Sequence, residues 1–142
     1  MEWPLSYEFA MWPAHQRSGG GESGYSVLAV DDQPSVLQLL RVWIEHDDRL
    51  HLAGTAAHGL AALEWVQNRC PDAVICDADM PVLNGVEVAP LLRRACPDSV
   101  IVLFTAAPER VPHDLGVDAV MEKTTQLPAL LDRVAELCQR RE

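Results

Sequence analysis

The feature that most constrains the fold is a regular alternation between short apolar runs and longer segments of helical period. The five apolar runs are SVLAV (26–30), LHLAGTA (50–56), AVIC (73–76), SVIVLF (99–104) and DAVME (118–122). Continuous apolar runs are typical of strands that are covered on both faces. Strands that alternate with helices predict an α/β fold with a doubly wound, five-stranded parallel sheet and right-handed crossovers.

The segments between these runs have apolar residues at helical spacing. Helices are expected over residues 34–46, 59–70, 86–95 and 125–139. Pro34 falls in a first turn, where proline is tolerated. Pro90 lies inside the segment 86–95, so a kink or a late start is expected there. Trp43 and Trp65 are expected to pack in or near the core.

Polar residues follow four of the five predicted strands. They are Asp31 and Asp32 after the first strand, Asp77 after the third, Thr105 after the fourth and Lys123 after the fifth. Open parallel sheets bind ligands beyond the carboxyl ends of their strands, near the point where the strand order switches. The sequence therefore predicts a single site at that edge of the sheet.

The chemistry of these residues favours phosphoryl transfer. Three neighbouring carboxylates would repel one another and raise at least one pKa. Mg²⁺, which prefers oxygen ligands, would relieve the repulsion, and Lys123 would add a positive charge. Asp77 would then attack phosphorus as a carboxylate that is already ionised near neutral pH, and Thr105 would bond a phosphoryl oxygen.

Each of these residues also has a simpler interpretation. Asp32 could cap the first helix, Asp77 could form a turn after its strand, and Thr105 could be a helix cap. Lys123 could be an ordinary solvated lysine. Their joint placement at strand ends favours a shared site. The 5 histidines show no paired spacing and are interpreted as surface or loop residues.

Taken in this order, the motifs resemble the receiver domains of two-component response regulators. The resemblance covers about residues 26–139 and rests on the acidic pair 31–32, PDAVICDADMPVLNG (71–85), Thr105-Ala106 and Lys123. It implies a flavodoxin-like sheet with strand order 2-1-3-4-5. It also implies a receiver domain over residues 25–142.

By this resemblance, Asp77 is the phosphoacceptor, and Asp32 and Asp77 bind Mg²⁺ directly. Asp79 would contribute its backbone carbonyl, and Asp31 would act mainly through water. The donor would be a phosphohistidine on a sensor histidine kinase or a phosphotransfer protein. Such a domain is a switch for contacts with an output protein, here unknown. It is not a turnover enzyme, and it loses its phosphoryl group at most by slow self-dephosphorylation.

Several positions depart from the family pattern. Thr124 stands where the family has a proline in a cis bond after the lysine, so a trans bond and a redirected Lys123 are expected. Val120 replaces an aromatic residue of the family's switch. The segment before Lys123 contains Pro108 and Pro112 and is shorter than usual by roughly one helical turn. A shortened fourth helix is expected, which favours output through another surface.

The composition excludes some classes of partner. The net charge of −10 argues against direct binding to nucleic acid or to an anionic membrane surface. No apolar run approaches the roughly 20 residues of a membrane span, and the first residues do not form a signal peptide. The cysteines at 70, 76, 96 and 138 match no metal-site spacing, so a reduced, cytoplasmic setting is expected.

Residues 1–24 differ from the rest and are interpreted as a flexible N-terminal extension. Their aromatic residues, Trp3, Tyr7, Phe9 and Trp12, are unusual for such a segment, and docking on this domain or on a partner is the alternative. A homodimer is left open.

Two other functions compete with a phosphorylated receiver. One is a degenerate receiver that binds partners without phosphorylation, which Thr124, Val120 and the shortened helix favour. The other is a magnesium phosphatase of the haloacid dehalogenase type, because Asp77 and Asp79 imitate its D-x-D motif. That motif belongs on the first strand of a longer chain, which argues against the phosphatase.

Overall fold

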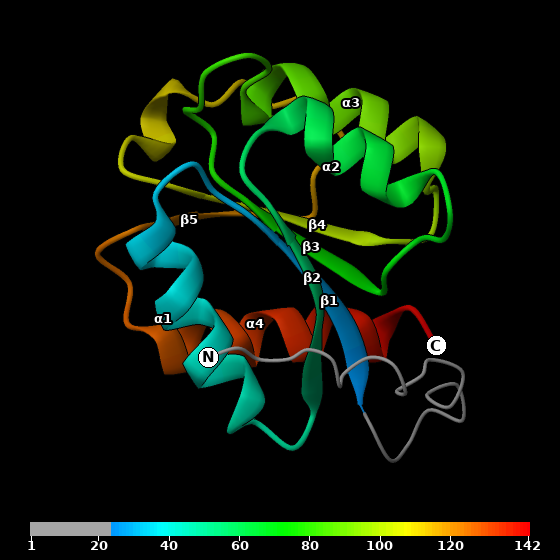
Figure 1. Ribbon diagram of the computed structural model, residues 1–142, viewed down its shortest axis with the longest axis vertical. Helices are drawn as coiled ribbons and strands as arrows, with labels where there is room; N and C mark the ends of the chain where they lie inside the picture. The colour runs from blue at the N-terminus through cyan, green and yellow to red at the C-terminus, as the bar shows by residue number, and fades with distance from the viewer. Residues whose placement is uncertain (1–23) are drawn as a thin grey trace.

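The computed structural model describes residues 24–142, which form a five-stranded parallel sheet covered by helices on both faces (Figure 1). The strands are β1 (Tyr25–Val30), β2 (Leu50–Ala56), β3 (Ala73–Cys76), β4 (Val100–Thr105) and β5 (Ala119–Glu122). Their order is β2-β1-β3-β4-β5, and every neighbouring pair is parallel. The predicted fold class and strand order are confirmed. The boundary at residue 24 stays a prediction, since residues 1–23 lie outside the described part of the chain.

Helices α1 (Pro34–Glu45) and α4 (Leu127–Arg140) cover one face of the sheet, and α2 (Gly59–Val66) and α3 (Gly85–Ala95) cover the other (Figure 1). Side chains along β1 alternate between the two resulting cores. Val27 and Ala29 pack on the side of α1 and α4, whereas Leu28 and Val30 pack on the side of α2 and α3. This alternation explains why the strand reads as an unbroken apolar run.

The connection between β4 and β5 contains no α-helix, only the 3₁₀ helix η3 (Pro108–Arg110). The prediction of a shortened fourth helix is therefore confirmed. Proline explains it, because neither Pro108 nor Pro112 can donate a backbone hydrogen bond to a helix. Strand β5 is an edge strand by the order of the sheet, and its residues are partly buried or, at Glu122, exposed.

Helix α3 begins at Gly85 and continues past Pro90 to Ala95, so the proline does not delay its start. A capping box fixes the beginning of this helix: the Asn84 side chain accepts from the backbone N–H of Glu87, and the Glu87 side chain accepts from that of Asn84. The helix therefore starts directly after the loop that follows β3.

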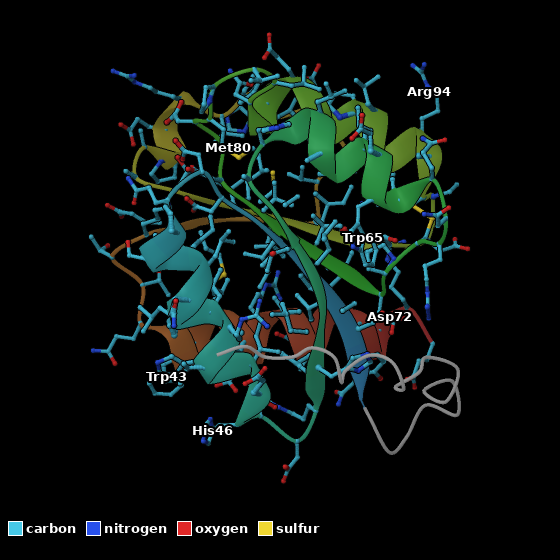
Figure 2. The ribbon with its side chains drawn as sticks, in the orientation of Figure 1. Trp43, His46, Trp65, Asp72, Met80 and Arg94 are labelled. Atoms are coloured by element: carbon cyan, nitrogen blue, oxygen red, sulfur yellow. A yellow bond between two sulfur atoms is a disulfide. The ribbon has the colours of Figure 1, made fainter. Side chains whose placement is uncertain are left out.

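The structure contradicts two expectations from the sequence: that all the cysteines are reduced, and that Trp43 packs in or near the core. Cys70 and Cys96 are joined by a disulfide, because the ends of α2 and α3 meet at one edge of the sheet and bring their Cα atoms within 5.7 Å. Cys76 and Cys138 are free and buried. Trp43 is 42% exposed and does not pack in the core, whereas Trp65 lies against β2 next to Gly54 (Figure 2). Among residues 24–142, no helix combines the length and apolarity needed to cross a membrane.

Candidate functional site

The polar residues that follow β1 and β3 lie at the same edge of the sheet. The backbone N–H of Asp31 donates to the carbonyl of Ala56 at 3.1 Å, and that of Asp77 donates to the carbonyl of Val30 at 2.9 Å. These bonds continue the sheet ladder by one residue past each strand. The two aspartates are therefore held in place by backbone pairing and not only by their side-chain contacts.

Three carboxylates converge at this edge. Asp31, Asp32 and Asp77 each offer one oxygen, and these oxygens all lie within 4.8 Å of one another. Asp31 is only 2% exposed and Asp77 only 6%, whereas Asp32 is exposed. Two buried carboxylates side by side are costly, so they require compensating donors and positive charge.

Lys123 supplies the positive charge. Its Nζ lies 2.9 Å from Oδ2 of Asp31 and 3.3 Å from Oδ2 of Asp77. The Lys123–Thr124 bond is trans, as expected, but the predicted redirection of Lys123 does not occur. The physical reason is that the Lys123 backbone N–H donates to the carbonyl of Thr105 at 2.8 Å, which fixes the start of the side chain beside the pocket.

Two backbone N–H groups complete the shell around the carboxylates. The N–H of Gln33 donates to Oδ1 of Asp31 at 2.9 Å, and the N–H of Asp79 donates to Oδ1 of Asp77 at 3.1 Å. Each bond spans two residues, the geometry with which aspartate stabilises the turn that follows it. The same bonds leave each Oδ2 facing Lys123.

Burial and charge act in opposite directions on Asp77. Burial raises the pKa of Asp77 above its ordinary value, and the negative charge of Asp31 adds to this. The N–H of Asp79 and the ammonium of Lys123 oppose the rise but do not cancel it. Burial alone would lower the pKa of Lys123, but its bonds to Asp31 and Asp77 raise that pKa overall, so this lysine stays charged.

The remaining predicted residues lie nearby without touching the carboxylates through their side chains. Thr105 is fully buried at the end of β4, and its Oγ1 accepts from the backbone N–H of Ala107 at 3.1 Å. Asp79 points an exposed side chain to solvent and contacts Asp77 through its backbone N–H. The roles predicted for the Thr105 hydroxyl and the Asp79 carbonyl stay predictions.

Two glycines support the site in a way that the sequence analysis missed. A Cβ on Gly85 would lie 2.3 Å from the carbonyl oxygen of Asp77, and a Cβ on Gly59 would lie 2.2 Å from that of Leu83. Both positions require glycine because the backbone after Asp77 passes too close for any side chain. The Asn84-Gly85 pair in the sequence was the available signal for the first of them.

This arrangement suits a hard divalent cation. Its donors are carboxylate oxygens, two of them on side chains already held by backbone N–H groups. Mg²⁺ is bound through one or two carboxylates while it keeps several waters, and the exposed Asp32 leaves an open side for these waters. The residues present therefore fit Mg²⁺, and Asp31, Asp32 and Asp77 would hold it.

Comparison with known proteins identifies relatives of this chain. The family model described as the response regulator receiver domain matches residues 27–135. The response regulator MprA of Mycobacterium sp. (strain KMS) is 36% identical over 118 residues, which cover 80% of this chain and 50% of that protein. A protein-glutamate methylesterase/protein-glutamine glutaminase of Halalkalibacterium halodurans is 29% identical over 122 residues, which cover 82% of this chain and 35% of that protein.

Solved structures agree with this comparison at the level of the fold. The response regulator domain of Thermotoga maritima CheB superposes with a TM-score of 0.73 at 24% identity, covering 82% of this chain and 97% of that one. A CheY-like receiver domain protein from Methanospirillum hungatei JF-1 gives a TM-score of 0.76 at 20% identity, covering 84% and 97%. The chain spans about a third to a half of the curated relatives named above, which share the matched region but extend beyond it.

Proposed function

Because the chain belongs to the response regulator receiver family of two-component signalling, we propose that it is a phosphorylation-controlled switch in which Asp77 accepts the phosphoryl group. One observation carries this proposal: the buried Asp77 carboxylate lies 3.3 Å from the Lys123 ammonium, within a cluster that also contains Asp31 and Asp32. The cluster combines a nucleophile, a fixed positive charge and oxygen ligands for a metal.

The proposed reaction transfers a phosphoryl group from a phosphohistidine to Asp77. A carboxylate oxygen of Asp77 forms a bond to phosphorus while the bond from phosphorus to the histidine nitrogen breaks, and the electron pair of that bond remains on the imidazole. The product is an acyl phosphate, and no proton has to be removed from Asp77. Lys123 would stabilise the charge on the phosphoryl oxygens, since its ammonium is already within reach of Asp77.

Bound Mg²⁺ would supply further electrostatic stabilisation of the phosphoryl oxygens. The residues of this chain would hold it in unequal ways. Both aspartates accept a backbone N–H at Oδ1, but Lys123 holds Oδ2 of Asp31 at 2.9 Å and that of Asp77 only at 3.3 Å, which supports a contact through water for Asp31. Asp32 is exposed and Asp77 carries the nucleophile, so these two are the proposed direct ligands, with the backbone carbonyl of Asp79.

The proposed partners follow from the same chemistry. The donor is a sensor histidine kinase or a phosphotransfer protein, and output occurs through contact with another protein or domain. The relatives named above extend beyond the region they share with this chain, and in a protein of that kind a further domain could respond to phosphorylation of Asp77. The net charge of −10 is unfavourable for nucleic-acid binding by this part of the chain itself.

The test is phosphorylation of the full chain by a small phosphodonor such as acetyl phosphate, with and without Mg²⁺, followed by intact mass spectrometry. Wild type should gain one phosphoryl group in a Mg²⁺-dependent way, Asp77→Asn should gain none, and Asp79→Asn, whose exposed side chain is adjacent, should behave like wild type. Labelling of Asp77→Asn at the wild-type rate would refute the proposal.

The two alternative functions receive less support. A degenerate receiver is expected to lose its lysine or acidic contacts, but Lys123 contacts both Asp31 and Asp77. A phosphatase of the haloacid dehalogenase type carries its D-x-D motif after the first strand, whereas Asp77 and Asp79 follow β3. Failure to phosphorylate together with retained Mg²⁺ binding would favour the degenerate receiver.

A further inference from the structure

Helix α1 has a second apolar side that faces solvent. Leu39 is 51% exposed, Val42 is 46% exposed and Trp43 is 42% exposed, while Leu40 and Ile44 on the opposite side are buried. Six large apolar residues are exposed between residues 24 and 142, and these three make up half of them. Exposed apolar patches of this kind occur at interaction surfaces more often than on the rest of a protein's surface.

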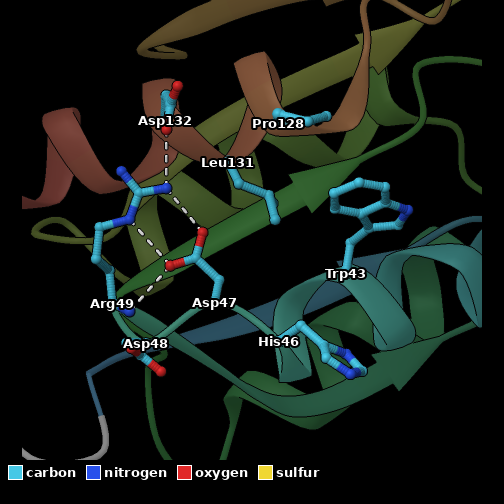
Figure 3. Close-up of a pocket in the computed structure, with 8 residues that line it drawn as sticks. All are labelled: Trp43, His46, Asp47, Asp48, Arg49, Pro128, Leu131 and Asp132. Carbon is cyan, nitrogen blue, oxygen red and sulfur yellow. Dashed lines mark hydrogen bonds and ion pairs between the residues drawn. The ribbon is translucent and has the colours of Figure 1, made fainter.

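A hollow of about 430 Å³ lies beside this side of α1 (Figure 3). Trp43 forms one wall, and Pro128 and Leu131 of α4 line the middle. The opposite wall is polar: Arg49 bonds Asp47 at 2.7 Å and Asp132 at 2.8 Å. An apolar wall facing a polar one suits an aromatic side chain that carries a polar edge, such as tryptophan or tyrosine.

The described part of the chain begins at the polar wall of this hollow. The backbone N–H of Tyr25 donates to the carbonyl of Arg49 at 2.8 Å, and a Cβ on Gly24 would lie 2.3 Å from the same oxygen. Gly24 has a φ of +75°, which glycine tolerates, so the chain can turn sharply at this point. The segment that precedes Gly24 is therefore attached to the sheet next to Arg49, which lines the hollow.

The segment that leaves there is rich in aromatic residues. It contains Trp3, Tyr7, Phe9 and Trp12, which are four of the eight aromatic residues in the whole chain. The stretch between Trp12 and Gly24, about 11 residues including three consecutive glycines, can span at most roughly 40 Å, which is enough to reach around one helix. A tethered segment of this length acts at an effective concentration of the order of mM.

We propose that residues 3–12 dock in cis on the surface formed by Leu39, Val42, Trp43 and Pro128, with the buried Leu131 at its floor, which we call the α1–α4 groove. The chain's own segment is favoured over a second copy because it is covalently joined to Gly24, which lies beside Arg49. Any protein that binds this side of α1 would have to displace the segment. The inference is independent of phosphorylation at Asp77.

The experiment uses nuclear Overhauser effects in isotope-labelled full-length protein. Ring protons of Trp3, Phe9 or Trp12 should give cross-peaks to methyl groups of Leu39, Val42 and Leu131. The triple substitution Trp3→Ala, Phe9→Ala, Trp12→Ala should abolish these cross-peaks and shift the amide signals of residues 39–46 and 128–132. The matched control within the segment is Gln16→Ala with Ser18→Ala, which should leave both sets of signals unchanged.

A reciprocal variant tests the groove itself. Leu39→Ser with Trp43→Ser should remove the cross-peaks, whereas Leu60→Ser on α2, where the leucine is 46% exposed, should preserve them. A mixture of labelled and unlabelled chains separates the occupants: cross-peaks between different molecules that strengthen with concentration would assign the groove to a second copy and overturn the proposal. Absence of cross-peaks at every concentration would overturn it as well.

Discussion

The ammonium of Lys123 donates to Oδ2 of Asp31 at 2.9 Å, across 92 residues of sequence. The same nitrogen lies 3.3 Å from Oδ2 of Asp77. A single positive charge therefore compensates two buried carboxylates that come from different strands of the sheet. The stability of this edge and its proposed chemistry both depend on that compensation.

Removal of the positive charge should destabilise the fold in a pH-dependent way. Lys123→Met should lower the free energy of unfolding by about 2 kcal/mol near neutral pH, less than the roughly 3–5 kcal/mol of a fully buried pair, since part of the lysine is solvated. Without Lys123, the pKa of Asp77 should rise further. A carboxyl group with a raised pKa binds a proton more readily in the folded chain than in the unfolded chain, so protonation stabilises the folded variant. The stability that Lys123→Met loses should therefore shrink as the pH falls from about 7 to about 5.

Urea denaturation over this pH range measures the effect. Arg133→Met is the control, because Arg133 pairs with Glu136 on the exposed side of α4 and such pairs contribute at most about 1 kcal/mol. A loss for Lys123→Met that is no larger than that for Arg133→Met, or that does not depend on pH, would contradict the compensation.

Magnesium should stabilise the folded chain through the acidic cluster. A ligand that binds only the folded state adds about 2.7 kcal/mol at a concentration one hundred times its Kd. The variant Asp32→Asn should lose most of this gain. Asp32 is exposed and takes no part in the ion pairs of Lys123, so its effect would come from metal binding. Asp48→Asn, at an exposed aspartate that lines the hollow between α1 and α4 and lies away from the cluster, should keep all of it. Equal gains in both variants, measured by denaturation with and without Mg²⁺, would contradict the ligand assignment.

Asp118 should contribute stability that disappears in acid. It accepts from the N–H of Ile101 at 2.8 Å and from Arg93 and Arg141, both at 2.7 Å. Burial alone would raise the pKa of Asp118, but these bonds lower it overall. A lowered folded-state pKa contributes stability above the ordinary aspartate pKa of about 3.9 and loses it as the pH falls toward the folded value.

The variant Asp118→Asn should therefore cost about 1–3 kcal/mol at neutral pH, and its difference from wild type should shrink below about pH 4. Asp98→Asn, on an exposed turn, is the control and should change little at any pH. A difference for Asp118→Asn that stays constant into acid would show that the charge of Asp118 contributes nothing.

Gly85 should matter for both stability and reactivity. An added Cβ would lie 2.3 Å from the carbonyl oxygen of Asp77 and 2.7 Å from the Cα of Ala78, and neither backbone atom can move without shifting the site. Gly85→Ala should cost about 1–3 kcal/mol and slow phosphorylation of Asp77. Gly116→Ala, where the nearest heavy atom is 3.7 Å away but φ is +79°, should cost about 1 kcal/mol and leave the phosphorylation rate unchanged.

Much of the fold could be predicted because its signals are local. Each strand is a short apolar run, and the polar residue that ends it stands next to it in the sequence, as Asp77 follows Cys76. Parallel pairing then brings these residues to one edge. The shortened fourth helix was also visible locally, in Pro108 and Pro112.

The features that escaped prediction depend on neighbours in space. The disulfide between Cys70 and Cys96 requires that the ends of α2 and α3 meet, which no spacing rule states. Trp43 belongs to a helix whose two sides are both apolar, so periodicity could not decide which side is buried. The N–H groups of Gln33 and Asp79 lie in turns that Asp31 and Asp77 stabilise, but the inward direction of these carboxylates depends on Lys123, which is distant in the sequence.

The most direct test of the account is to locate the acyl phosphate in the sequence. After phosphorylation with Mg²⁺, borohydride reduces an aspartyl phosphate to homoserine, and peptide mass spectrometry identifies the converted position. The account predicts homoserine at position 77, and none in Asp77→Asn or after Mg²⁺ is removed. Conversion at Asp31, Asp32 or Asp79 in place of Asp77, or conversion that does not depend on Mg²⁺, would contradict it.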